Sequence, residues 1–254
     1  MTERQPFSLV IITRDAVELL QDCIASVPGA DEVLVVDSGS SDATVALAER
    51  LGARVIHQDW LGYGPQKRLA ALRAKHDWVL SLDADERLTP ELRASIEQAM
   101  RAPDAVAYVL PRRNRFMGRW LRHGEGYPDW CARLFDRRRA NWSDDPVHEK
   151  LEADGPSRRL AGDLLHESEQ GLADYLVKQN RYTDLQAARM YAAGKRFSAV
   201  KLLTSPLARF AKFYFLRGGF LDGVPGLVHI AIGCFTSFLK YAKLYELQRA
   251  GRRD

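Results

Sequence analysis

The first hundred residues of this chain alternate between short apolar runs and segments with helical periodicity. Four runs have the length and apolar content of strands, at residues 7–13, 32–37, 54–57 and 78–82. A helix is predicted after each of them, at 16–27, 42–51, 65–76 and 89–101, and Thr89 is suited to cap the last one. Four such alternations predict a parallel sheet with helices on both faces, because each helix carries the chain back to the start of the next strand.

The stretch 79–86 joins a strand to a cluster of acids. Residues 79–82 are typical of a strand buried in a sheet interior, and three acids follow within four residues. Open α/β sheets bind ligands at the carboxyl ends of their strands, where Asp83 and Asp85 are expected. Neighbouring carboxylates repel each other unless a cation neutralises them, and Mg²⁺ or Mn²⁺ binds one or two carboxylates and substrate phosphates. The sequence therefore predicts a divalent-metal site, with a solvated loop as the alternative.

Polar residues also follow the first two predicted strands. The first strand ends in Thr13, with Asp15 two residues beyond it, and the second ends in Asp37. Polar strand ends that meet at one edge of a sheet predict a nucleotide-binding cleft. The serines within 38–41 are suited to capping the helix that follows. No G-x-G-x-x-G follows the first strand and no P-loop motif occurs in the chain, which argues against dinucleotide-binding and P-loop proteins.

Composition narrows the class of protein further. At 254 residues the chain is long enough for one large domain, or for a domain with an appendage. The cysteines Cys23, Cys131 and Cys234 lack metal-ligand spacing and cannot all pair, which predicts a reducing compartment. Residues 1–6 are polar and lack the apolar core of a signal peptide, so translocation is not expected.

The sequence pattern changes after a fifth predicted strand at 105–110. Residues 111–170 are rich in Arg, Trp, Gly and Pro, which predicts irregular structure over the open edge of the sheet. The remainder is predicted to be helical, in segments 172–193, 198–216 and 224–249. We therefore predict an α/β domain over 1–170, of which about 1–110 binds the nucleotide, and a helical C-terminal region over 171–254.

Several motifs, taken in order, resemble the family 2 inverting glycosyltransferases of the GT-A fold. Three lie in the predicted sheet: Leu9-Val10-Ile11-Ile12-Thr13, Val35-Val36-Asp37-Ser38-Gly39-Ser40-Ser41-Asp42 and Leu82-Asp83-Ala84-Asp85. Others are similar to the bacterial lipopolysaccharide-core β-1,4-glucosyltransferase type, namely Trp60–Arg68, Pro111–Asn114, Gly118–Trp120, Tyr127–Asp129, Arg133–Phe135, Pro146–Glu149, Arg217–Gly223 and Phe238–Lys243. The resemblance covers nearly the whole chain, and the order of the motifs makes it specific.

The resemblance implies a Rossmann-like GT-A domain that transfers a hexose, glucose from UDP-glucose, with inversion to a lipopolysaccharide core or similar lipid-linked oligosaccharide. Asp85 together with Asp83 would hold a divalent metal that neutralises the leaving diphosphate. In the family the acid after the second strand contacts the nucleotide base, which here is Asp37, and Asp15 would lie beside the same nucleotide. Lys67 is expected either to meet the phosphate charge or to begin a solvated helix.

Inverting transfer also requires a general base, which in this family is usually a carboxylate. Asp129 is the first choice because it stands four residues before Arg133, as the family's acid stands before an arginine-containing strand. The sequence departs from the common Glu-Asp pair at this point, since Tyr127-Pro128 precedes Asp129. Glu149 therefore remains a rival base, and Glu125 is a further candidate.

Two histidines have competing interpretations. The resemblance implies that His166 completes the metal site, as a late histidine does in some members of the family. His148 and Glu149 begin like a zinc-protease helix, but the sequence has Glu152 where that motif needs its second histidine. A hydrogen-bonded structural role is the alternative for both His148 and His166.

Basic residues interleaved with aromatic residues are concentrated over 112–123. Such a pattern suits nucleic acid in principle. The resemblance implies instead an anionic lipid-linked oligosaccharide, whose phosphate and acid groups arginine side chains would bind, and no nucleic-acid partner. A solvated charged loop is the third alternative. The residues assigned to the acceptor are Arg112, Arg113, Arg115, Trp120, Glu125 and His148.

The apolar stretch 224–239 is shorter than the roughly 20 residues that a membrane-spanning helix needs. Basic and aromatic residues flank it, which favours a helix lying on an anionic leaflet. This predicts a peripheral protein on the cytoplasmic face of the inner membrane. The alternative is packing of these helices on the catalytic domain or on a second copy of the chain in a homo-oligomer.

Two rival functions share a nucleotide-binding α/β domain. A sugar-nucleotide pyrophosphorylase needs a glycine-rich basic loop after the first strand, and Thr13-Arg14-Asp15 is not one. A non-catalytic, membrane-bound sugar-nucleotide binding protein would keep the fold without turnover. The presence of both Asp83 and Asp85 argues against this second rival.

Overall fold

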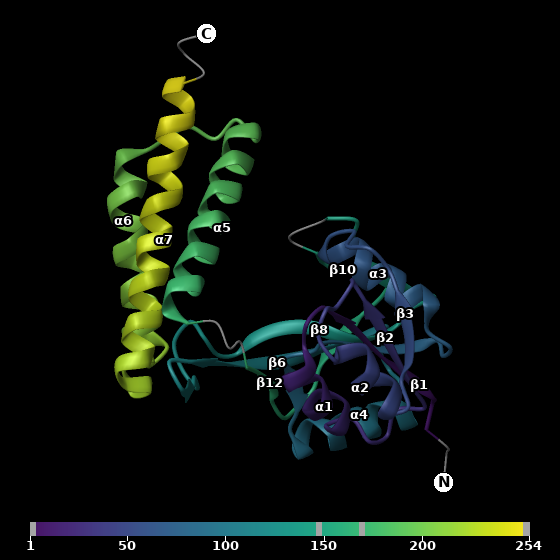
Figure 1. The fold of residues 1–254 in the computed structure, drawn as a ribbon. Helices are drawn as coiled ribbons and strands as arrows, with labels where there is room; N and C mark the ends of the chain where they lie inside the picture. The colour runs from purple at the N-terminus through teal and green to yellow at the C-terminus, as the bar shows by residue number, and fades with distance from the viewer. Residues whose placement is uncertain (1–3, 146–148, 168–170, 251–254) are drawn as a thin grey trace. The chain divides into compact units, whose positions relative to one another are not determined.

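The computed structural model describes residues 4–145, 149–167 and 171–250, and it divides the chain into two compact units (Figure 1). We call Met1–Arg112 together with Trp130–Glu167 the sheet unit, and Arg113–Asp129 together with Ser168–Asp254 the helical unit. The sequence predicts that all of 111–170 belongs to the α/β domain. In the structure, Arg113–Asp129 groups with the helices instead.

The sheet unit is built on four parallel strands in the order β3-β2-β1-β4. They are β1 (Phe7–Thr13), β2 (Glu32–Asp37), β3 (Arg54–His57) and β4 (Trp78–Asp83). Every residue of β1 is buried, because this strand lies between β2 and β4 and packs against core clusters on both faces of the sheet. The predicted α/β class is confirmed, and the four predicted strands are correct to within one residue.

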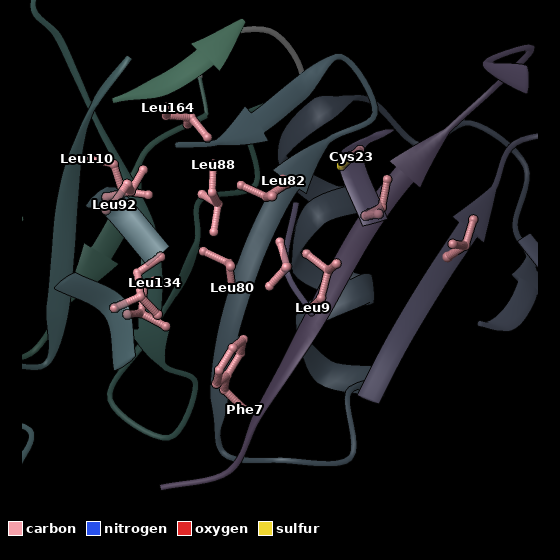
Figure 2. Close-up of a cluster of buried hydrophobic side chains, with 14 of the residues drawn as sticks. Phe7, Leu9, Cys23, Leu80, Leu82, Leu88, Leu92, Leu110, Leu134 and Leu164 are labelled. Carbon is pink, nitrogen blue, oxygen red and sulfur yellow. The ribbon is translucent and has the colours of Figure 1, made fainter. Parts of the chain in front are cut away.

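Four helices cover the sheet: α1 (Val17–Ala25), α2 (Thr44–Arg50), α3 (Tyr63–Arg73) and α4 (Pro90–Arg101). Leu9 and Ile11 of β1 pack with side chains of α1, α2 and α4 in one cluster, part of which Figure 2 shows. Val10 and Ile12 pack with alanines of α3 in a second cluster. Because side chains of a strand point alternately to its two faces, a single apolar run contributes to both clusters.

Two of these helices begin differently. The Thr89 hydroxyl accepts a hydrogen bond from the N–H of Leu92 at the start of α4, so the predicted cap is confirmed. No side chain caps α2, and the serine cap predicted there is wrong. The serines before α2 bind two acids of neighbouring loops instead, as described below.

The other half of the sheet was predicted only in part, by the strand expected at 105–110, which overlaps the start of β6. β8 (Asp129–Asp136) pairs antiparallel with β4, and the sheet continues through β6 (Ala107–Phe116), β12 (Leu164–His166) and β5 (Glu86–Leu88). The irregular structure predicted over 111–170 is therefore wrong for much of that segment. It also holds four more short strands: β7 (Arg119–Trp120), β9 (Ala140–Trp142), β10 (Leu151–Ala153) and β11 (Ser157–Arg159). Strands of two or three residues are too short to show a hydrophobic period in the sequence.

The helical unit contains three long helices with two short turns between the second and the third. These elements are α5 (Leu172–Ala192), α6 (Ala199–Phe210), the π-helix η1 (Ala211–Leu216), the 3₁₀-helix η2 (Gly219–Asp222) and α7 (Gly223–Ala250). α7 packs against both α5 and α6 (Figure 1). Gly226 permits a close approach within this unit, because a Cβ there would lie 2.5 Å from the carbonyl oxygen of Gly219. All three predicted helices are present, and the one predicted over 198–216 changes to π geometry at Ala211.

The apolar stretch predicted over 224–239 lies inside a longer helical segment. Gly219–Ala250 has 32 residues and is long and apolar enough to cross a membrane by length and composition alone. About 28% of its most apolar window is buried inside the protein. The stretch 224–239 is thus part of a longer helical segment, and its place on a membrane surface stays a prediction.

Candidate active site

The carboxyl ends of three neighbouring strands bring acids to one edge of the sheet. In the strand register, Thr13 of β1 lies beside Asp37 of β2, and Ile12 of β1 lies beside Asp83 of β4. Adjacent strands are about 4.8 Å apart, so the backbones of Asp37 and Asp83 lie roughly 10 Å apart across β1. The predicted convergence of Thr13, Asp37 and Asp83 at this edge is present in the structure.

A serine turn connects the two acids that were assigned to the nucleotide. Asp37 is almost fully buried, and its carboxylate accepts hydrogen bonds from the backbone N–H groups of Gly39 and Ser40, both at 2.9 Å, and from the Ser40 hydroxyl. The Ser40 hydroxyl accepts from the N–H of Asp15 at 2.8 Å, and Asp15 accepts from the N–H of Ser41 at 2.7 Å. These bonds from Ser41 lower the pKa of the exposed Asp15 carboxyl. Asp37 therefore shapes the turn, while Asp15 remains exposed at its surface.

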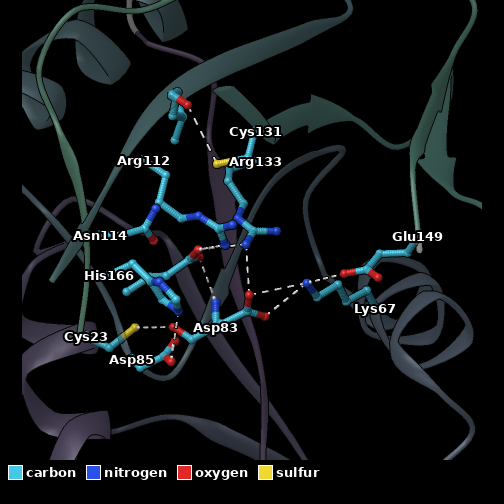
Figure 3. A network of polar contacts seen from close by, with 12 residues as sticks. Cys23, Lys67, Asp83, Asp85, Arg112, Asn114, Cys131, Arg133, Glu149 and His166 are labelled. Atoms are coloured by element: carbon cyan, nitrogen blue, oxygen red, sulfur yellow. Dashed lines mark hydrogen bonds and ion pairs between the residues drawn. The ribbon is translucent and has the colours of Figure 1, made fainter. Parts of the chain in front are cut away.

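Asp83 is held between two buried cations (Figure 3). Its carboxylate lies 3.1 Å from Lys67 Nζ of α3 and 2.8 Å from Arg133 Nη2 of β8. The indole ring of Trp142 lies against both cations, with its centroid 5.1 Å from Lys67 Nζ and 5.9 Å from Arg133 Cζ. Burial raises the pKa of Asp83, but the positive charges of Lys67 and Arg133 lower it more, so the net pKa is well below the usual range. Asp83 is therefore ionised and fixed in orientation.

Glu86 and Glu149 complete the neutralisation of this network. Glu86 is fully buried and accepts hydrogen bonds from Arg133 at 2.7 Å, from Arg112 at 3.3 Å and from the N–H of Asp83 at 3.1 Å. Glu149 Oε1 lies 3.0 Å from Lys67 Nζ. Three cations therefore face three carboxylates, and buried charges of this kind are tolerated when each one is paired and hydrogen-bonded.

Asp85 has a different set of partners from Asp83. His166 Nε2 lies 3.2 Å from Asp85 Oδ2, because β12 pairs with β5 and places His166 beside Glu86 (Figure 3). Asp85 Oδ1 is buried and has no hydrogen-bond partner in the part of the chain that the structure describes. Among the described residues, no lysine or arginine forms an ion pair with Asp85, and no group of three or more His, Cys, Asp or Glu side chains is arranged around a metal position. The pair fits a divalent cation that takes an oxygen and an imidazole ligand from the protein and its other ligands from substrate phosphates and water.

The structure thus separates residues that the sequence grouped together. Asp83 and Lys67 belong to the internal ion-pair network, whereas Asp85 contacts His166 and keeps a buried carboxylate oxygen without a hydrogen-bond partner among the described residues. Arg133, Glu86 and Trp142 were not predicted as site residues. For Arg133 the sequence did contain a signal. It is the charged residue of the otherwise apolar Arg133–Phe135 stretch, and a charge among core residues indicates a buried partner of opposite charge.

The residues assigned to the acceptor lie in both units. Arg112 belongs to the sheet unit and binds Glu86. Arg113 donates to the carbonyl oxygen of Leu121, Arg115 lies against the Trp120 ring, and Glu125 forms an ion pair with Arg209, all within the helical unit. The Glu125 carboxylate is engaged in this ion pair, and its role as a base stays a prediction. Asp129 begins β8, four residues before Arg133, and His148 lies outside the described residues.

The chain is similar to glycosyltransferases over nearly its whole length. Residues 8–151 match the sequence model of glycosyl transferase family 2. The uncharacterized glycosyltransferase RT0209 of Rickettsia typhi is 34% identical, with 96% of this chain and 88% of that protein covered. The lipopolysaccharide core biosynthesis glycosyltransferase LpsC of Rhizobium meliloti is 30% identical, with 97% of this chain and 94% of LpsC covered.

A solved structure shows the same fold. The TarS 1–349 structure from S. aureus has a TM-score of 0.50 and 13% sequence identity, with 98% of this chain and 92% of that chain covered. Its likeness supports the predicted GT-A architecture. Because the family model matches more than half of the sequence and LpsC matches nearly all of it, this chain belongs to glycosyl transferase family 2.

Proposed function

We propose that this glycosyltransferase transfers glucose from UDP-glucose, with inversion, to a lipopolysaccharide core or similar lipid-linked oligosaccharide at the cytoplasmic face of the inner membrane. The observation that carries the proposal is the contrast between the two acids after β4. Asp83 is neutralised by Lys67 and Arg133, whereas Asp85 keeps a buried oxygen without a partner beside His166. The similarity to LpsC, a lipopolysaccharide core biosynthesis glycosyltransferase, supports the choice of acceptor class.

Asp85 and His166 are the residues proposed to hold a divalent metal. When bound, Mg²⁺ or Mn²⁺ supplies positive charge that stabilises the leaving diphosphate. We assign Lys67 to positioning the end of β4 rather than to direct phosphate binding, because its ammonium group is buried between Asp83 and Glu149. Together with Arg133 it fixes the end of β4, and so the backbone on which Asp85 is carried.

The proposed nucleotide site is the edge formed by Thr13, Asp37 and the exposed loop at Asp15. The turn between Asp15 and Asp37 is already formed by serine hydrogen bonds, so a nucleotide would meet a preorganised surface. We assign Asp15, rather than Asp37, to direct contact with the ligand. Asp37 is almost fully buried and has its hydrogen bonds satisfied by the turn itself.

Asp129 is the proposed general base. Its carboxylate takes the proton of the acceptor hydroxyl as the hydroxyl oxygen attacks the anomeric carbon, and the bond from that carbon to the diphosphate oxygen breaks. UDP leaves with the bonding electrons, and the new bond forms on the opposite face of the sugar. Glu149 is the second candidate, but its carboxylate already neutralises Lys67. Family membership favours this reaction over the pyrophosphorylase and the non-catalytic alternatives.

The test is calorimetric titration of the full chain with UDP, with and without Mn²⁺ or Mg²⁺, followed by transfer assays with a panel of UDP-sugars and lipid-linked acceptors. We expect UDP binding that requires metal, and transfer from UDP-glucose. Binding of ADP or GDP in place of UDP would overturn the donor assignment. UDP-sugar binding without either transfer or hydrolysis would favour the non-catalytic alternative.

A further inference from the structure

The outer face of α6 is apolar and uncovered. Val200, Leu203 and Leu207 are 69%, 64% and 70% exposed, and no residue of α6 is buried. Their spacing of three and four residues places them on one side of the helix, in a single stripe. Phe215 and Leu216, at the end of η1, follow the stripe with 61% and 84% exposure. We call these five residues the α6 stripe.

The opposite side of α6 is held by contacts within the helical unit. Ser205 forms a hydrogen bond of 2.8 Å with Ser237 of α7, and Arg209 pairs with Glu125. α6 also packs along α7. The α6 stripe therefore starts on the exposed side of a helix whose other side is held by α7 and Glu125, and exposed apolar residues grouped in this way are typical of an interaction site.

The charge around the stripe is of one sign. Between residues 195 and 221 the sequence contains six basic residues and no acid. Lys201 and Lys212, next to the stripe in sequence, are both exposed. An apolar stripe bordered by lysines is the composition of a helix that lies in a membrane interface, where the apolar side chains enter the acyl boundary and the ammonium groups reach anionic headgroups.

We propose that the α6 stripe docks this protein on the anionic surface of a membrane. A second copy of the chain is the less suitable occupant, because a two-fold interface brings the same patch of both copies together, and here that would bring two positively charged patches together. The proposal rests on the proposed function only in that the acceptor is lipid-linked. It differs from the sequence-based expectation in assigning docking to α6 and η1 rather than to the apolar stretch of α7.

The direct test is co-sedimentation of the full chain with vesicles of phosphatidylglycerol and phosphatidylethanolamine, compared with phosphatidylcholine alone. The double variant L203Q/L207Q removes apolar contact while keeping good helix formers. We expect at least about a tenfold loss of vesicle partitioning, consistent with two side chains withdrawn from the acyl boundary. The variant K201Q/K212Q should weaken binding to anionic vesicles and reduce its sensitivity to salt.

The matched control is V177Q, which replaces a residue that is 72% exposed on α5. It should bind vesicles like the unchanged protein. Equal binding by L203Q/L207Q and the unchanged protein would overturn the proposal. A dimer seen in sedimentation velocity, and dissociated by L203Q/L207Q, would also overturn it. Extraction from cell membranes by detergent only would overturn it as well, because that result would indicate that α7 spans the bilayer.

UDP titration of the same variants separates this proposal from the proposed function. L203Q/L207Q should bind UDP and metal as the unchanged protein does, because the substitutions lie in the helical unit, whereas Asp83 and Asp85 belong to the sheet unit. Vesicle binding by a protein that binds no nucleotide would remove the proposed function and leave the docking surface standing. Sugar transfer by a protein that does not bind vesicles would overturn the docking proposal and leave the proposed function supported.

Discussion

Arg133 donates a hydrogen bond of 2.8 Å to the carboxylate of Asp83. The same guanidinium nitrogen lies 2.7 Å from Glu86 Oε1, so one buried group joins strand β8 to both acids that flank the turn after β4. The bond therefore positions Asp85, which that turn carries. It also makes stability and the geometry of the site depend on the same side chain.

Replacing Arg133 with Met should destabilise the protein strongly. Removing one partner of a buried ion pair leaves uncompensated charge on Asp83 and Glu86, which costs about 3–5 kcal/mol. Urea unfolding should show the loss, and R138M is the matched control. Arg138 is 60% exposed in its pair with Asp136, so its replacement should destabilise the protein far less than R133M does. Similar costs for the two variants would contradict the buried network.

Replacing Asp85 with Asn should abolish the increase in UDP affinity that metal provides, because the partly unpaired carboxylate would no longer be present as a ligand. Calorimetric titration with UDP and Mn²⁺ measures this. The variant H166Q should reduce the same metal effect. The control is D77N, which changes an aspartate immediately before β4, at the opposite end of that strand. Retention of full metal dependence in D85N would exclude Asp85 as the ligand.

Replacing Asp129 with Asn should slow transfer by roughly 100-fold to 10,000-fold while UDP binding stays the same. An amide cannot accept the proton of the acceptor hydroxyl, whereas donor affinity depends on the strand ends of the sheet unit. Steady-state transfer and UDP titration are measured on the same samples. The paired variant E149Q should retain transfer. The reverse result, an active D129N and an inactive E149Q, would identify Glu149 as the base.

Replacing Glu32 with Gln should weaken the fall in the free energy of unfolding as the pH is lowered. Burial raises the pKa of Glu32, but hydrogen bonds from the Ser8 hydroxyl, the Lys75 N–H and Arg54 lower it more, so the folded pKa lies below the unfolded value. The stability from Glu32 is fully present above the unfolded pKa of about 4.3 and is lost as pH falls through the folded pKa.

The measurement is the urea midpoint at a series of pH values below about 5. The unchanged protein should lose stability more steeply than E32Q over this range. The control E49Q alters an exposed glutamate on α2 and should keep the steep decline. Parallel curves for E32Q and the unchanged protein would show that Glu32 has no such linkage.

Much of the site could be anticipated because its residues follow strands with clear patterns. Thr13, Asp37 and Asp83 each end a buried apolar run, and parallel strands place such ends at one edge. The partner of each acid could not be anticipated in the same way. Lys67 carries no local sign of burial, since its helix shows no apolar face that would predict it, and Glu149 lies far along the chain.

The amino-acid sequence by itself determined the parallel half of the sheet, the cap at Thr89 and the three C-terminal helices. These features depend on apolar periods and on hydrogen bonds between near neighbours, which act over a few residues. Only the tertiary structure showed how the strands of the antiparallel half pair, that Lys67 and Arg133 are buried, and that Asp83 rather than Asp85 pairs with these two cations. Each of these needs a partner distant in the chain, and a buried charge is stable only where folding brings its counter-charge and hydrogen bonds together.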